Sequence, residues 1–438
     1  MLTSPPNVFP AQTCGLPHLV IKPMDSKRNS PINSNSIPLE LRLLLSCLRA
    51  SAGLDEGDRI ESLIRRITDW DAFMRQVNHH HVVSPVYKSL KRYAGNSIQG
   101  PVFSDLKDRY RQNALRTFWK AAELGRIVKR FKRKGIRVLP IKGPVVAVQA
   151  CGDLGSRHVG DLDILVSPEQ TFEAENILLR DGYRRIHPHF ELTPRQRLAY
   201  IHRNHHFGYS SRKRGVMVEL HWRFGSNRRL FPLKFDGLWQ TRQTLKLGGA
   251  QVSTLSPEHT ILLLCAHGSG HAWSSLFWLN DVAQLVAKYD ALDWRVLMGR
   301  AEQSGIARMV AEGVLLASVL LGSPLPDPVR YYIRKDRGVN RIAGKAFYLM
   351  NHSSGSSHKP FTYPWYCTKS HEHMLRRDPD YKLTVFAAIL GADYGDWGRV
   401  PLPDALFPFY YLLRPVTWFF RYFVPKTKIY REGPMGRG

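Results

Sequence analysis

The stretch that decides the fold is VLPIKGPVVAVQACGDLGSRHVGDLDILVSPEQ, Val138 to Gln170, and above all its GDLDILV. Successive residues of a β-strand point to opposite faces of its sheet, so Asp161 and Asp163 share one face, roughly 6.6 Å apart along the strand. The neighbouring residues Leu162 and Ile164 to Val166 are apolar and fit a buried strand. Two carboxylates on one face repel each other unless a cation lies between them. The stretch therefore predicts a strand that carries a cation site.

The residues around this strand predict a small α/β core over residues 136–225. Apolar runs bounded by turn residues indicate further strands, and helical spacing indicates helices between them. The expected strands are IRVLPIK, HHFGYSS and VMVELHWRF (136–142, 205–211 and 216–224), and the expected helices are GPVVAVQAC and SPEQTFEAENILLRDGY (143–151 and 167–183). Gly143 opens the first helix, and Pro144 takes its first position.

The strand VMVELHWRF supplies a third acid. Its alternation puts Glu219 and His221 on one face, and if it neighbours GDLDILV, Glu219 lies beside Asp161 and Asp163. Three carboxylates on one sheet face suit divalent metal, and two Mg²⁺ ions roughly 3.5–4 Å apart commonly serve phosphate transfer. We therefore expect Mg²⁺, with Mn²⁺ as the alternative. An isolated Asp-x-Asp can instead be a turn or an ion-pair feature, and His221 can simply cap the site.

The order of these motifs, KG followed by R…GDLDILV and later VELHWRF, resembles the uncharacterised nucleotidyltransferase family of the polymerase-beta-like nucleotidyltransferase superfamily. The resemblance implies an α+β fold: a small mixed-sheet nucleotidyltransferase domain flanked by N-terminal and C-terminal helical regions. It also implies a metal-dependent transferase that moves NMP from an NTP to an acceptor and releases pyrophosphate. The acceptor stays open among a small molecule, a sugar, a protein and an RNA end. The resemblance assigns catalysis and metal binding to Asp161, Asp163 and Glu219, and nucleotide binding to Lys142, Gly143 and Arg157.

The chain departs from the superfamily pattern before the first helix, where IKGPVV replaces the usual Gly-Ser element. Pro144 removes both a hydroxyl and an N–H donor that could bind phosphate. Lys142 and Arg157 could supply those contacts, or they could merely neutralise the acids. This departure motivates the alternative function, a non-catalytic nucleotide-binding or membrane-associated scaffold with the same fold.

The flanking segments are expected to be mostly helical. We expect a disordered leader over residues 1–37, an N-terminal helical domain over 38–135 and a second helical domain over 226–350. Consecutive histidines at 79–81 point in different directions on a helix and cannot all bind one ion. His267 and His271 are spaced i, i+4 and could bind metal together with Asp281, or they could face substrate or pack.

The last part of the chain is less regular. Residues 351–380 are rich in Ser, His and Pro and are expected to form a loop or lid. Residues 381–438 form an aromatic and basic segment, in which LFPFYYLLRPVTWFFRYFVPKTK interleaves aromatic residues with Arg and Lys. This composition suits a bilayer interface, and it also suits a helix that packs its aromatic face on the protein.

Composition limits the class of protein. The 438 residues are 43% hydrophobic and 23% charged, which excludes disorder of the whole chain. Lys and Arg number 63 against 36 Asp and Glu, and the net charge of +27 favours an anionic partner: nucleic acid, nucleotide phosphates or an anionic membrane. A generally basic, solvated surface explains it equally well. Five dispersed cysteines and no apolar run long enough for a simple span predict a cytoplasmic protein, with peripheral membrane contact as an option.

Overall fold

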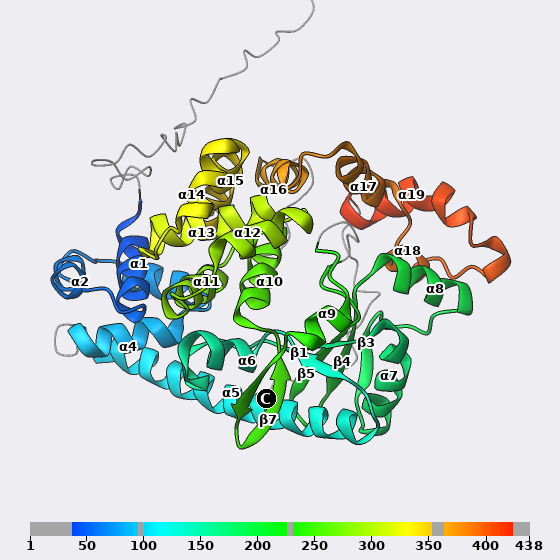
Figure 1. Ribbon diagram of the computed structural model, residues 1–438, viewed down its shortest axis with the longest axis horizontal. Helices are drawn as coiled ribbons and strands as arrows, with labels where there is room; N and C mark the ends of the chain where they lie inside the picture. The colour runs from blue at the N-terminus through cyan, green and yellow to red at the C-terminus, as the bar shows by residue number, and fades with distance from the viewer. Residues whose placement is uncertain (1–36, 95–97, 99, 226–230, 353–362, 424–438) are drawn as a thin grey trace, which may run out of the picture.

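The computed structural model describes residues 37–94, 98, 100–225, 231–352 and 363–423. It has the predicted α+β architecture, in which a small mixed sheet lies between N-terminal and C-terminal helices (Figure 1). Residues 1–36 of the predicted leader lie outside the described residues. No helix in the described ranges is long and apolar enough to cross a membrane.

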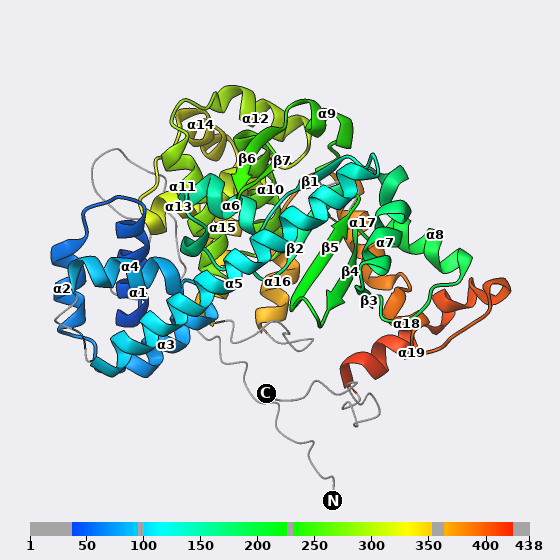
Figure 2. The same ribbon diagram turned by 90° about the horizontal axis from the view of Figure 1, so that it is seen from below.

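The first described segment consists of helices, as the apolar spacing predicts. Its longest member is α5, whose 34 residues pass alongside the sheet (Figures 1 and 2). Gly135 follows this helix with φ of +74°, a left-handed conformation in which glycine is not strained. The helices are α1 (Leu39–Ser51), α2 (Gly57–Ile64), α3 (Trp70–His79), α4 (Val83–Tyr93) and α5 (Gly100–Arg133).

The central sheet has the order β1-β2-β5-β4-β3. Its strands are β1 (Val138–Pro140), β2 (Leu162–Val166), β3 (Arg184–His187), β4 (His206–Ser211) and β5 (Val216–His221). Strands β2 and β5 pair in parallel, and the other pairs are antiparallel. All five residues of β2 are buried, which accounts for its nearly continuous apolar sequence.

Short helices connect these strands. The predicted helix after Gly143 divides into α6 (Pro144–Val146) and one π-helical turn (147–151), and a 3₁₀ turn (154–156) follows. The predicted helix near Ser167 is a 3₁₀ turn (168–170) continued by α7 (Thr171–Arg180). The sequence patterns did not indicate β3 or α8 (Pro194–Arg203), and β3 alternates between exposed and half-buried residues.

After the sheet, the described chain is helical with one exception. Strands β6 (Gln243–Leu247) and β7 (Ala250–Thr254) form a hairpin within the segment expected to be helical. Gly248 and Gly249 both have positive φ at its turn, as a two-residue hairpin connection requires. The helices are α9 (Phe235–Gln240), α10 (Pro257–Gly270), α11 (Leu276–Lys288), α12 (Trp294–Gln303), α13 (Ala307–Leu321), α14 (Asp327–Lys335) and α15 (Gly338–His352).

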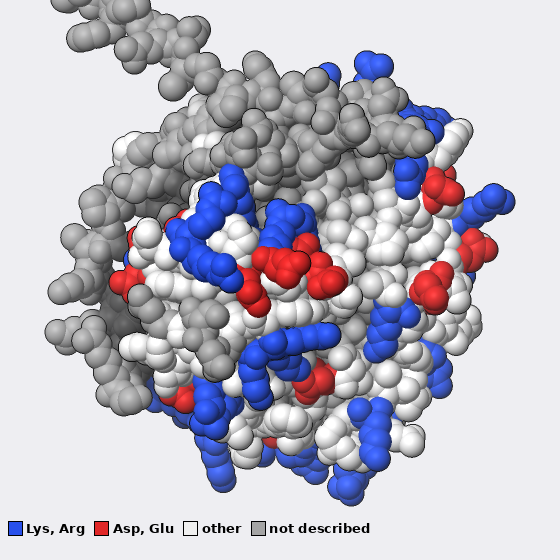
Figure 3. All heavy atoms as spheres, turned by 90° about the vertical axis from the view of Figure 1, so that its left-hand side faces the viewer, with Lys and Arg blue, Asp and Glu red and all other residues white. Residues whose placement is uncertain are grey.

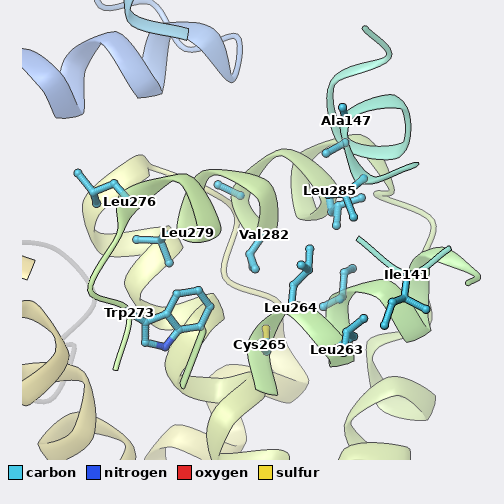
Figure 4. Close-up of a cluster of buried hydrophobic side chains, with 14 of the residues drawn as sticks. Ile141, Ala147, Leu263, Leu264, Cys265, Trp273, Leu276, Leu279, Val282 and Leu285 are labelled. Carbon is cyan, nitrogen blue, oxygen red and sulfur yellow. The ribbon is translucent and has the colours of Figure 1, made fainter. Parts of the chain in front are cut away.

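An apolar cluster joins α10 and α11 to the sheet domain (Figure 4). Leu263 and Leu264 of α10 and Leu285 of α11 lie near Ile141 and Ala147, which follow β1. Trp273, between the two helices, is fully buried, and a Cβ added to Gly268 would come within 2.4 Å of its ring. Gly268, the first glycine of HGSGHAW, is therefore a site of close packing against Trp273, which lies between α10 and α11.

Residues 363–374 form helix α16 (Tyr363–Met374), where the sequence predicted a loop or lid; residues 353–362 of that prediction lie outside the described residues. The remaining elements are α17 (Pro379–Leu390), α18 (Tyr394–Trp397), a 3₁₀ turn (404–406) and α19 (Phe409–Phe423). Seen from the left of Figure 1, Lys and Arg side chains are spread over the surface with Asp and Glu among them (Figure 3). On that face the excess positive charge is distributed over several groups.

Candidate active site

The three predicted acids come together at one cavity. Asp163 of β2 and Glu219 of β5 are direct partners in the parallel pair, and Asp161 immediately precedes β2. All three line a cavity of about 840 Å³, together with residues of α10 and α11. The strand alternation in the sequence, combined with the β2–β5 pairing, therefore places the three carboxyl groups on one side of the sheet.

Lys142 supplies a positive charge to these acids. Its Nζ lies 2.5 Å from Oδ1 of Asp163, which is only 2% exposed. Burial alone would raise the pKa of Asp163, but Lys142 and then His221 outweigh it and hold this pKa well below the usual range. Burial likewise opposes the charge on Lys142, yet Asp163 and Asp161 keep its pKa above the ordinary value. The two groups form a buried, charged pair.

His221 bridges two of the acids. Its Nε2 lies 3.1 Å from Oε2 of Glu219 and 3.3 Å from Oδ1 of Asp163. Burial lowers the pKa of His221, but its contacts with both carboxylates raise it overall. Burial raises the pKa of Glu219, and His221 and His206 outweigh burial and lower it. His221 thus belongs to the acidic cluster itself, whereas the sequence suggested that it could simply cap the site.

Two further histidines complete this wall of the cavity. His206 pairs with His221 across β4 and β5, and its Nε2 lies 3.5 Å from Oε1 of Glu219. Burial and nearby positive charge lower the pKa of His206 to about 4, and they lower that of His205 further. Both are therefore neutral imidazoles, which can bind metal. In the sequence, the consecutive histidines 205 and 206 were the available signal. Only the order of the strands shows that His206 lies beside Glu219.

The side chains that could hold a metal form two overlapping groups among the described residues. One is Asp163, Glu219 and His221, and the other is His205, His206 and His221; within each, the ligand atoms lie within 4.8 Å of one another. Asp161 adds a carboxyl whose pKa is raised to about 6 by burial and by the charges of Asp163 and Glu219. Burial is the largest cause of that rise, and the two neighbouring carboxylates add to it against the opposing charge of Lys142. Carboxylate oxygens with excess negative charge fit a divalent cation.

Gly143 brings its backbone close to these acids. Its φ is +65°, and an added Cβ would come within 3.0 Å of the carbonyl oxygen of Asp161. A side chain at this position would therefore be strained and crowded. The glycine of the KG motif is thus required by the contact between this turn and the start of β2.

Arg157 lies at the cavity but is held by an acid from another helix. Its Nε lies 2.9 and 2.8 Å from the two carboxylate oxygens of Asp281 on α11, and Nη1 donates to the carbonyl of His158. Arg157 and Asp281 are 7% and 1% exposed. The predicted phosphate contact by Arg157 is therefore not preformed, and Asp281 pairs with Arg157 instead of joining His267 and His271.

His267 and His271 face the same cavity. Their ring centroids lie 4.6 Å apart, and both rings contact Trp278. Burial, and next to it Lys142, lowers the pKa of both histidines, so both are neutral. They line the cavity from α10 and the residue after it, a position that is compatible with both the packing and the substrate-facing interpretation.

A smaller hollow of about 250 Å³ adjoins the acids on the side of α5. It shares His81, His158 and Gly160 with the main cavity, and α5 contributes Arg109, Arg116 and Lys120. Lys120 Nζ donates to the carbonyl oxygens of Val159 and Gly160, both at 2.6 Å. His81, from the run after α3, stacks on His158 with centroids 4.6 Å apart. The sequence showed these as residues of a helix and its end, without their place at the site.

Comparison with known proteins gives one family. None of the curated proteins compared with this chain matches it. Residues 67–322 match the family described as "Uncharacterised nucleotidyltransferase", and this match covers more than half of the 438 residues and includes every acid of the cavity. The chain therefore belongs to the uncharacterised nucleotidyltransferase family, which indicates nucleotidyl transfer as its general activity.

Proposed function

We propose that this chain is a metal-dependent nucleotidyltransferase of the polymerase-beta-like type, which transfers NMP from an NTP to an acceptor. The observation that carries this proposal is the convergence of Asp161, Asp163 and Glu219 at one large cavity, with the pKa of Asp161 raised to about 6. A structural ion pair would leave the acids neutralised. Here their repulsion is only partly relieved, as in a site built for a cation.

The reaction exchanges one phosphate bond for another. The acceptor oxygen forms a bond to the α-phosphorus of the NTP, the bond between the α-phosphorus and the bridging oxygen breaks, and pyrophosphate leaves with that electron pair. The acceptor's proton passes to a base. Asp161, Asp163 and Glu219 would hold Mg²⁺ or Mn²⁺, which stabilises the developing negative charge and lowers the pKa of an attacking hydroxyl. Glu219 can also accept that proton, because it is half-buried at the cavity and its lowered pKa keeps it ionised.

The basic residues then bind the triphosphate. Lys142 already carries its charge at the acids, and it can turn from Asp163 to a phosphate once a metal ion neutralises them. Gly143 lets the backbone approach at the same turn. Arg157 has the role of a positioning residue, because its guanidinium joins the chain before β2 to α11. The four described cysteines are free thiols, which agrees with the cytoplasmic setting that we propose.

Calorimetric titration tests this proposal. Each NTP is titrated with Mg²⁺ into the parent protein and into the double variant Asp161→Asn, Asp163→Asn, with thermal melts to establish that both are folded. The exposed Asp290→Asn is the matched control. We expect Mg²⁺-dependent binding in the parent and the control and none in a folded double variant. Binding that is indifferent to the double substitution would refute the site.

Turnover separates the enzyme from the alternative, a non-catalytic nucleotide-binding scaffold. The missing Gly-Ser element and the ion pair between Lys142 and Asp163 favour that alternative. Release of pyrophosphate is measured with each NTP and with candidate acceptors of four classes: small alcohols, sugars, protein hydroxyls and RNA ends. Metal-dependent release that Glu219→Gln abolishes would exclude the scaffold. Tight nucleotide binding without release in any combination would favour it.

A further inference from the structure

Helix α19 turns described polar side chains toward the protein: Arg414 and Thr417 are both buried. Arg414 Nη1 lies 2.7 Å from Oδ2 of Asp396, and Thr417 Oγ1 donates to Oδ1 of the same carboxylate at 2.6 Å. Asp396 is fully buried, and Arg414 also lies 3.4 Å from Asp393. The hydroxyl of buried Tyr410 donates to the carbonyl of Val400. These contacts fix which face of α19 is turned inward.

The opposite face of α19 is apolar and exposed. Leu412 is 74% exposed, and the other members of this face are between 52% and 54% exposed. Positions separated by 3, 4, 7 and 11 residues lie on one side of a helix. The neighbouring helix α17 adds Leu383 and Phe386, which are 65% and 60% exposed. We call these residues the α17–α19 surface: Leu383, Phe386, Phe409, Leu412, Val416, Phe419 and Phe420.

Helix α19 lies at the periphery of the molecule. Both ribbon views place α19 at the end of the molecule away from α1 and α2 (Figures 1 and 2). The packing alternative raised by the sequence does not hold for these side chains, because each is at least half exposed. Exposed large apolar side chains gathered on one helix face mark an interaction site.

The chemistry of the surface fits a lipid bilayer better than a second copy of the chain. Helix α19 has 15 residues, about 22 Å of helix, and Pro415 lies inside it. It can therefore lie in the bilayer interface, but it is too short to span the bilayer. The sequence after it, residues 424–438, contains four Lys or Arg and a single Glu. An aromatic helix face next to basic residues is the composition of interfacial helices on anionic lipid. A net charge of +27 on each copy opposes self-association.

We propose that the α17–α19 surface docks on an anionic bilayer, with its aromatic and leucine side chains among the acyl chains. This inference does not depend on the proposed catalysis. It does bear on the site, because Thr384 and Val385 of α17 line a hollow that shares His205, His267 and His271 with the catalytic cavity. Docking would therefore hold the catalytic cavity near the membrane surface.

Co-sedimentation of the full chain with vesicles tests the proposal. Vesicles of phosphatidylcholine are compared with vesicles that also contain phosphatidylglycerol, at low and high salt. We expect binding to the anionic vesicles that salt weakens. The double variant Leu412→Glu, Phe420→Glu should bind at least about tenfold more weakly, since it replaces two large apolar side chains of the surface by charged ones. The control is Leu115→Glu on α5, whose leucine is 71% exposed and should be unimportant for binding.

Two further measurements give each outcome a meaning. Thermal melts should show no loss of stability in the double variant, because both side chains are exposed. Light scattering after gel filtration reports the oligomeric state of the parent and of the variant. Equal vesicle binding by the parent and the variant would overturn the proposal. A parent dimer that the double variant breaks, without vesicle binding by either, would instead assign the surface to self-association.

Discussion

The buried ion pair between Arg157 and Asp281 allows a test of the role of Arg157. The guanidinium of Arg157 contacts both carboxylate oxygens of Asp281, at 2.8–2.9 Å. The backbone carbonyl of Arg157 accepts a hydrogen bond from Asn113 at 3.1 Å. Burial raises the pKa of Asp281 even beside Arg157, so burying this pair is costly. A costly pair adds little net stability, but removing one partner leaves the other charge buried and unpaired.

The perturbations are Asp281→Leu, Arg157→Met and the double variant Arg157→Met, Asp281→Leu. Each single substitution should lower the free energy of unfolding by about 3–5 kcal/mol, because both side chains are less than a tenth exposed. The double variant should lose less than either single variant, since no buried charge remains. The coupling between the two positions should therefore be at least about 3 kcal/mol.

Urea unfolding followed by tryptophan fluorescence and circular dichroism measures these values, with the exposed Asp290→Asn as a control that should change stability by less than about 0.5 kcal/mol. Titration of NTP into the folded variants is done in parallel. Single variants that each lose less than about 1 kcal/mol, or losses that simply add in the double variant, would refute the reasoning. An Arg157→Met protein of full stability with lost NTP affinity would restore the phosphate contact expected from the family pattern.

Three other predictions follow from the cavity and from the packing of Trp273. The affinity for Mg²⁺ should fall as the pH drops below about 6, by up to about tenfold per pH unit. The reason is that Asp161, whose pKa is raised to about 6, must lose its proton to bind metal. Calorimetry between pH 5 and pH 8 should show this change of affinity in the parent and not in Asp161→Asn. Lys142→Met should lower the melting temperature without metal, since the acids lose their cation, and Mg²⁺ should then raise the melting temperature more than in the parent. An equal Mg²⁺-induced rise of the melting temperature in the variant and the parent would contradict this. Gly268→Ala should lower the free energy of unfolding in urea by about 1–3 kcal/mol, because its Cβ would meet Trp273. Gly270→Ala, whose Cβ would have nothing within 4 Å, should be neutral or slightly stabilising. Equal effects at the two positions would refute the packing argument.

The part of the site that lies along strands could be predicted from the sequence. The alternation in GDLDILV and VMVELHWRF fixes which side chains share a face, and both segments contain mostly apolar residues that only a buried strand would use. The remaining assumption was that these strands are neighbours, and the pairing of Asp163 with Glu219 confirms it. The α+β architecture followed from the same change of period between helical and strand-like segments.

Elements without a clear apolar pattern could not be predicted. Strand β3 is RRIH, an edge strand with alternating exposure, and β6 is QTLKL, the more exposed strand of a hairpin whose other strand is mostly buried. Helix α16, YPWYCTKSHEHM, has no apolar stripe at helical spacing, so its sequence resembled a loop. In each case tertiary packing or a hairpin turn decides the structure, and local propensity does not.

Contacts between distant segments account for the site residues that sequence reasoning missed or placed differently. Asp281 lies 124 residues after Arg157, and no local pattern connects the two. Lys120 was one of many basic residues on α5, but it approaches the acids because α5 crosses beside the chain before β2. A charge can therefore be assigned to substrate from sequence only after its intramolecular partners are known.

Lys142 shows how both interpretations of one basic residue can hold together. The sequence left open whether it neutralises the acids or contacts phosphate, and the structure has it at Asp163. We propose that these are two states of one side chain. Without a metal ion the acids require Lys142, because its ammonium group lies beside buried Asp163 and opposes the repulsion that, after burial, raises the pKa of Asp161. A divalent cation would take over that neutralisation and release the ammonium group toward the phosphates of the nucleotide that arrives with the metal. Metal and nucleotide binding should then be cooperative, and Lys142→Met should reduce that cooperativity even though it strengthens binding of the metal alone.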